Sequence, residues 1–169
     1  VPQLALREKL ARLHTLSGQV ELAVAQYDAI LAVAQNAPYR ATIEFRAAEA
    51  LLDAGDRNNG LQRMERIFNE YVGQPQAYQA MDILLESGRQ LDRYAVGRVS
   101  YFSQDYERAI ESFNAFTSQM QLAAIPPELH LLLGRSYRAM GNSDAAQVAF
   151  QTLIDQHPTD PLFGDALLE

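Results

Sequence analysis

The stretch 127–160 constrains the fold most, because it reads as two helices of fixed spacing joined by a glycine turn. Gly134 in the first helix and Ala146 in the second are small, which allows the two helices to approach closely. Gly141 between them can adopt the left-handed conformation that ends a helix. Pro158 cannot continue a helix interior, so the second helix should stop before it. The stretch therefore predicts a pair of closely packed antiparallel helices.

Larger side chains stand at fixed intervals around these small residues. The spacing is W-x2-L-G-x2-Y in the first helix, with His in place of Trp, and A-x3-F in the second. The residues that carry it are His130, Leu133, Gly134, Tyr137, Ala146 and Phe150. This pattern closely resembles the tetratricopeptide repeat. The resemblance implies an all-α, right-handed helical solenoid in which the first helix of each pair lines a concave face. It also makes His130 a packing residue.

The pattern recurs along the rest of the chain. Gly97, Ala109 and Phe113 repeat it 37 residues earlier. The interval from Gly60, the small residue of an earlier pair, to Ala109 exceeds this period by twelve residues, the length of one short helix and a turn. We therefore expect one extra helix at 75–85, which breaks the regular pairing.

The apolar spacing also gives boundaries for the remaining helices. The first helix should end near Leu16. A last one should start with Asp160 as its cap and Pro161 in its first turn. The others are expected at 21–34, 39–54, 57–71 and 90–103. The sequence thus predicts about nine helices plus a truncated C-terminal helix, in one continuous domain over 1–169.

Composition excludes several classes of partner and chemistry. The net charge of −7 argues against general binding to nucleic acid or to an anionic membrane. The absence of Cys excludes disulfides, thiolate metal sites and cysteine nucleophiles. No apolar run approaches the roughly 20 residues needed to cross a bilayer. Because the chain begins at Val1 and ends at Glu169 within a helical pattern, we expect it to be an excised piece of a longer protein, whose targeting signals would lie elsewhere.

No motif in the sequence carries a known catalytic chemistry. The three His residues, His14, His130 and His157, stand on separate expected helices without a His partner four residues away. The phosphate-binding glycine loop, the nucleophile elbow and the dinucleotide fingerprint are all absent. We expect no enzyme activity in these residues, no metal site and no cofactor.

A narrower resemblance concerns the segments 93–113 and 136–169. Both resemble the repeat region that precedes the catalytic domain in some bacterial soluble lytic transglycosylases, and periplasmic repeat proteins of outer-membrane assembly are similar to them as well. In the transglycosylase family a helical superhelix carries a separate domain that cleaves peptidoglycan. The family's catalytic Glu-Ser precedes a Gly-rich segment, which neither Glu86-Ser87 nor Glu111-Ser112 does. The resemblance implies a location in the bacterial cell envelope or periplasm, or secretion from the cell. The alternative location, if the resemblance does not apply, is the cytoplasm.

The repeat frame selects residues for the expected groove. Arg98 and Arg135 recur at 37 residues and should lie side by side in it. The residues chosen are Tyr94, Arg98, Tyr101, Leu131, Arg135 and Arg138, with Phe45 and Glu49 at equivalent places in an earlier pair. Such a set would bind a carboxylate of a peptide C-terminus, an acidic segment or a peptidoglycan stem peptide, because bidentate Arg–carboxylate bonds are about twice as strong as neutral ones. The alternative is that both arginines pair with acidic residues of the chain itself.

Three functions fit this sequence. The first is a non-catalytic scaffold that presents a groove to a protein or peptide. The second is the accessory superhelix of a peptidoglycan lytic transglycosylase whose catalytic domain lies outside these residues. The third is a structural oligomerisation module.

Overall fold

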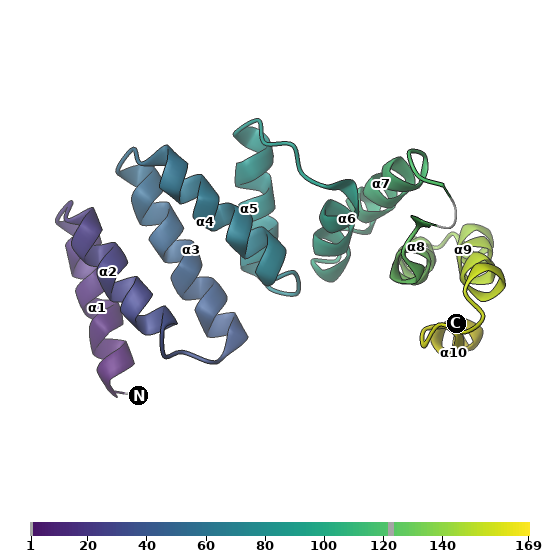
Figure 1. Cartoon of the computed structure of the whole chain (residues 1–169), viewed down its shortest axis with the longest axis horizontal. Helices are drawn as coiled ribbons and strands as arrows, with labels where there is room; N and C mark the ends of the chain where they lie inside the picture. The colour runs from purple at the N-terminus through teal and green to yellow at the C-terminus, as the bar shows by residue number, and fades with distance from the viewer. Residues whose placement is uncertain (1, 122–123) are drawn as a thin grey trace. The chain divides into compact units, whose positions relative to one another are not determined.

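The computed structural model describes residues 2–121 and 124–169, and these residues form ten α-helices and no strand (Figure 1). The predicted all-α fold is therefore confirmed, as is the helix number. The helices are α1 (Pro2–Leu16), α2 (Val20–Leu31), α3 (Ala37–Asp53), α4 (Arg57–Glu70), α5 (Pro75–Glu86), α6 (Arg93–Phe102), α7 (Tyr106–Thr117), α8 (Pro127–Ala139), α9 (Ser143–Gln156) and α10 (Phe163–Leu168).

The helices fall into two compact units, Val1–Gln90 and Leu91–Glu169. In the first unit α1 pairs with α2 and α3 with α4, while the extra helix α5 packs against both α4 and α3 (Figure 1). In the second unit α6 pairs with α7 and α8 with α9, and the short α10 packs on α9. The expected extra helix is thus present. A single continuous domain over 1–169 stays a prediction.

Small residues bring the paired helices together as the spacing predicts. A Cβ atom on Gly134 would lie 2.4 Å from Cε1 of Phe150, and one on Gly97 would lie 2.5 Å from Cε1 of Phe113. Both distances are far below van der Waals contact, so each phenyl ring occupies the space that a side chain at the glycine would need. The repeat pattern therefore encodes the packing directly.

Several boundaries differ from the expected ones because capping decides them. The helix expected from residue 90 begins at Arg93, since the side chain of Asp92 accepts a hydrogen bond from the Ala95 amide at 2.9 Å. The prediction that Asp160 and Pro161 start the last helix is wrong. The Asp160 carboxylate instead accepts from the Leu162 amide at 2.8 Å in a turn, and α10 starts two residues after Pro161.

The turn between α6 and α7 contains the one described non-glycine residue with a positive φ. Gln104 has φ 64°, at the place that Gly141 (φ 79°) occupies in the next pair. An L-residue in this conformation costs about 1–2 kcal/mol. We expect Gln104→Gly to raise the free energy of unfolding by about 0.5–1 kcal/mol, because glycine also makes the unfolded chain more flexible. Urea denaturation would measure the gain, and Gly141→Ala should show a loss of similar size.

His130 fills the position of the repeat tryptophan and is buried, as predicted. Its ring centroid lies 6.2 Å from that of His157, and among the described residues neither Nε2 atom has a hydrogen-bond partner. Burial, together with the charge of His157, lowers the pKa of His130. The neutral imidazole is therefore the form that the folded repeat accommodates.

This burial makes stability depend on pH. Because the pKa of His130 is lower in the folded state, the unfolded state binds more protons as the pH falls below about 6.5. The stabilisation that the buried neutral imidazole of His130 gives the folded state is complete above that pH and is lost at lower pH. We expect the free energy of unfolding to fall between pH 7 and pH 5, and His130→Leu to flatten this part of the profile.

Candidate functional site

In the second unit, the residues predicted for the groove lie on α6 and α8. Each of these is the first helix of its pair, and the two helices pack against each other. Tyr94, Arg98 and Tyr101 are partly exposed on α6, and Arg135 and Arg138 are accessible on α8. Leu131 is different, because its side chain is buried in a core cluster with Phe150 and Leu153. We use the name arginine face for the accessible set, which is Tyr94, Arg98, Tyr101, Arg135 and Arg138.

Glu128, in the first turn of α8, links two members of the arginine face. The Tyr94 hydroxyl donates a hydrogen bond to Oε2 of Glu128 at 2.6 Å, and Nε of Arg98 lies 3.3 Å from the same oxygen. The Arg98 guanidinium also lies 5.8 Å from the centroid of the Tyr94 ring, in cation–π geometry. Burial and the bond to Glu128 raise the pKa of Tyr94, so its hydroxyl remains a donor. These contacts fix both α6 side chains.

A second carboxylate, that of Glu169, is held by the two arginines of α8. Nε of Arg135 donates to Oε1 of Glu169 at 2.6 Å, while Arg138 forms an ion pair with Oε2 and donates to the main-chain oxygen at 3.3 Å. Burial lowers the pKa of Arg135, but the hydrogen bond and charge of Glu169 outweigh it, so the pKa is raised. Two guanidinium groups thus enclose one carboxylate.

The alternative in which both predicted arginines pair with acidic residues of the chain describes the structure correctly. Arg98 pairs with Glu128 and Arg135 with Glu169. The pairing does not bury them, because the side chains of Arg98 and Arg135 remain 34% and 32% exposed. Both arginine side chains therefore remain partly accessible to a ligand.

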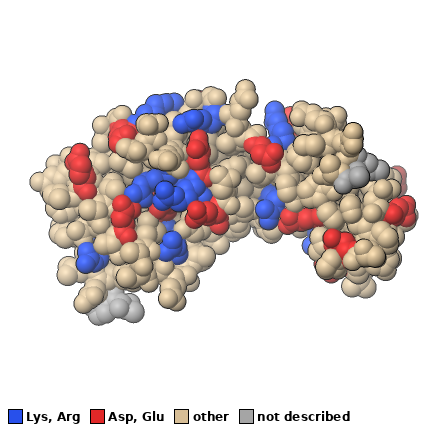
Figure 2. Space-filling view, viewed as in Figure 1, with Lys and Arg blue, Asp and Glu red and all other residues tan. Residues whose placement is uncertain are grey.

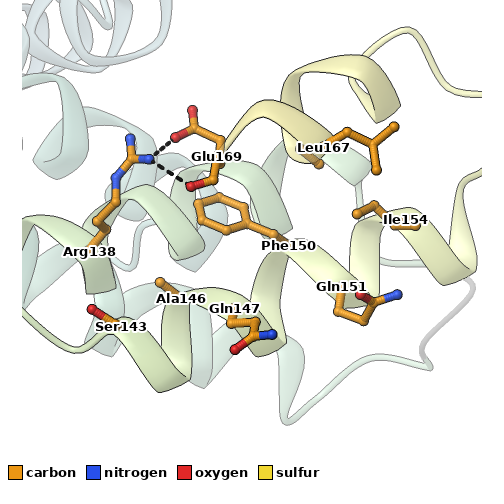
Figure 3. Close-up of a pocket in the computed structure, with 10 residues that line it drawn as sticks. Arg138, Ser143, Ala146, Gln147, Phe150, Gln151, Ile154, Leu167 and Glu169 are labelled. Atoms are coloured by element: carbon orange, nitrogen blue, oxygen red, sulfur yellow. Dashed lines mark hydrogen bonds and ion pairs between the residues drawn. The ribbon is translucent and has the colours of Figure 1, made fainter.

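A hollow of about 370 Å³ opens beside the Arg138–Glu169 pair (Figure 3). Its apolar residues are Ala146, Phe150, Ile154, Ala166 and Leu167, and Gln147 and Gln151 stand beside them along α9. Figure 3 shows the phenyl ring of Phe150 between the ion pair and the leucine on α10. Sequence reasoning missed this hollow, since one of its walls is α10, whose start was placed too early.

The two predicted residues of the first unit lie on α3. Glu49 borders a hollow of about 310 Å³ with Arg12, Arg46 and Asp53. Burial and the charge of Asp53 raise the pKa of Glu49, and Arg46 opposes this shift. Phe45 is half-buried and is not among the residues that line the hollow. The first unit therefore offers a mixed-charge surface rather than a cluster of arginines.

No group of three or more acidic or histidine side chains in 2–121 and 124–169 is arranged to hold a metal ion. Within the same residues, no helix is both long and apolar enough to pass through a bilayer.

Comparison with known proteins identifies one repeat. Residues 128–160, which include α9 and all but the first residue of α8, match the family model described as Tetratricopeptide repeat. No curated protein matches the chain. Among solved structures, the chain is similar to a putative kinesin light chain of Podosopora anserina with nearly identical TPR-like repeats, at 18% identity and a TM-score of 0.37, over 95% of this chain and 78% of that one. A point variant of the same protein is similar at 17% identity and a TM-score of 0.37, over 98% and 80%.

Proposed function

We propose that this chain is a non-catalytic scaffold whose arginine face binds a protein or peptide through exposed carboxylates. The observation that carries the proposal is the cradle formed by Arg135 and Arg138, which already holds the carboxylate of Glu169. The match of α8 and α9 to a repeat whose stacked copies present extended binding surfaces supports the same conclusion.

Binding at this cradle is an exchange of carboxylates. A ligand carboxylate takes the place of Glu169, so the ion pair itself contributes only about 0–1 kcal/mol net. Further affinity comes from aromatic surface, since Tyr and Arg are the side chains that most often dominate binding energy. Tyr94 and Tyr101 supply that surface on α6.

A titration with the Arg98→Ala, Arg135→Ala double variant tests the proposal. An acidic peptide labelled with a fluorophore should lose several-fold to about tenfold in affinity, because each arginine contributes up to about 1 kcal/mol net and 1.4 kcal/mol is tenfold in Kd. The matched control is Arg93→Ala, an exposed arginine on α6. Unchanged affinity in the double variant would discard the arginine face.

The same titration with different ligands distinguishes the possible sources of the carboxylate. A peptide with amides in place of its carboxylates should not bind. Muropeptides carry stem carboxylates, so tighter binding of muropeptides than of acidic peptides would support the accessory region of a peptidoglycan-cleaving enzyme. Glu169→Gln should strengthen binding of any carboxylate ligand, because it removes the internal competitor.

A further inference from the structure

The first helix of the chain exposes a row of leucines. Leu6, Leu10 and Leu13 are spaced by four and three residues, so they lie on one face of α1. All three are exposed, Leu13 by 60%, while Ala11 on the opposite side is fully buried in the core that α1 forms with α2. We call this row the leucine stripe. Contiguous exposed apolar surface of this kind can mark an interaction site.

The last helices expose apolar surface as well. Leu167 on α10 is 60% exposed and stands across the hollow from Ile154 and Phe150 on α9 (Figure 3). We call this surface the trough, defined by Ala146, Phe150, Ile154 and Leu167. Its volume of about 370 Å³ and its open side suit the apolar side chains of a docking helix.

The two surfaces carry opposite charges. Residues Arg7, Lys9 and Arg12 make α1 basic against a single acidic residue, Glu8. The stretch 143–169, which contributes α9 and α10 to the trough, contains five acidic residues and neither Lys nor Arg. One of the five, Glu169, is paired with Arg138, which also lines the hollow, and the other four leave this stretch with a negative charge. Two stripes would repel each other, and so would two troughs, whereas a stripe and a trough attract.

We propose that copies of this chain associate head to tail, with the leucine stripe of one copy seated in the trough of the next. The spacing of Leu6, Leu10 and Leu13 gives the i, i+4, i+7 anchors of a helix docked in a groove. The contact joins different surfaces of the two copies, so each pair leaves one stripe and one trough open and longer assemblies follow. This association goes beyond the proposed ligand binding, since the stripe belongs to α1 and lies outside the arginine face.

Two blocking variants test the geometry by sedimentation velocity over about a hundredfold range of concentration. Leu10→Asp places a charge in the stripe, and Leu167→Asp places one in the trough. Each variant alone should remain a monomer, because each lacks one of the two surfaces. An equal mixture should form a species of two copies that does not grow, since one intact trough meets one intact stripe.

The controls separate this contact from general loss of solubility or structure. Val148→Asp changes an exposed apolar residue of α9 that does not line the trough, and it should associate like the wild type. Circular dichroism checks that each variant is folded, and Leu13→Asp replaces Leu10→Asp if the latter unfolds α1. A wild type that stays monomeric, a mixture that does not pair, or a Leu167→Asp variant that still associates alone would each overturn the proposal.

Discussion

Replacing Glu44 by Ala is expected to lower the free energy of unfolding of the first unit by about 3 kcal/mol or more. The Glu44 side chain on α3 is only 3% exposed. Nη1 of Arg63 lies 3.2 Å from both of its oxygens, and Nη1 of Arg66 donates to Oε1 at 2.9 Å. Both arginines come from α4. Removing the carboxylate leaves the largely buried Arg63 with the half-exposed Asp28 as its remaining partner, so its Nη1 loses both of its hydrogen bonds to Glu44 in a region of low dielectric.

The same arginine provides a matched control. Nη2 of Arg63 also binds Asp28 on α2, at 2.7 Å, but the Asp28 side chain is half exposed. Asp28→Ala should therefore cost less than about 1 kcal/mol, as exposed ion pairs do. Urea denaturation followed by circular dichroism measures both variants. Equal losses for Glu44→Ala and Asp28→Ala would show that burial does not set the cost.

This cluster also explains why three helices of the first unit hold a fixed arrangement. Arg63 and Glu44 connect α2, α3 and α4, which belong to two successive pairs. Figure 2 shows basic and acidic side chains lying next to one another on the visible face of the first unit. Replacing the pair by apolar residues, as in Glu44→Leu with Arg63→Leu, should restore most of the stability lost in Glu44→Ala.

The helices were predictable because their packing rules are local. The repeat spacing places Gly134 and Phe150 on facing helices, and the structure brings them into contact. The extra helix α5 followed from a surplus of residues between two recognisable pairs. The boundaries were less predictable, since caps such as Asp92 compete with other polar residues nearby and only the final geometry selects one.

The partners of the candidate site were not predictable in the same way. The repeat frame found Arg98 and Arg135, but not Glu128 or Glu169, which pair with them from positions 30 and 34 residues further along the chain. Ion pairs of this kind depend on how one helix pair stacks on the next. Because the repeat period varies along the chain, the sequence does not determine which residues of successive helix pairs face each other. Predicting the hollow beside Arg138 would also have required the position of α10, which forms one of its walls.

The largest effect expected in the second unit is that of Phe150→Ala. The Phe150 ring is buried, fills the space at Gly134 and forms part of the trough. Removing a buried phenyl group costs about 3–5 kcal/mol, because the lost burial adds to the cavity left behind. Urea denaturation should show this loss. A cost below about 1 kcal/mol would mean that the ring does not hold α8 and α9 together.

A double-mutant cycle with Gly134 separates this contact from the general cost of a cavity. In the wild type, Gly134→Ala should be destabilising, by about 1–3 kcal/mol, because its Cβ would lie 2.4 Å from the Phe150 ring. In the Phe150→Ala background the ring is absent, and alanine is favoured over glycine in a helix by about 1 kcal/mol. The same substitution should then be neutral or stabilising. A coupling above about 1 kcal/mol confirms direct contact, whereas additive effects would place the strain elsewhere.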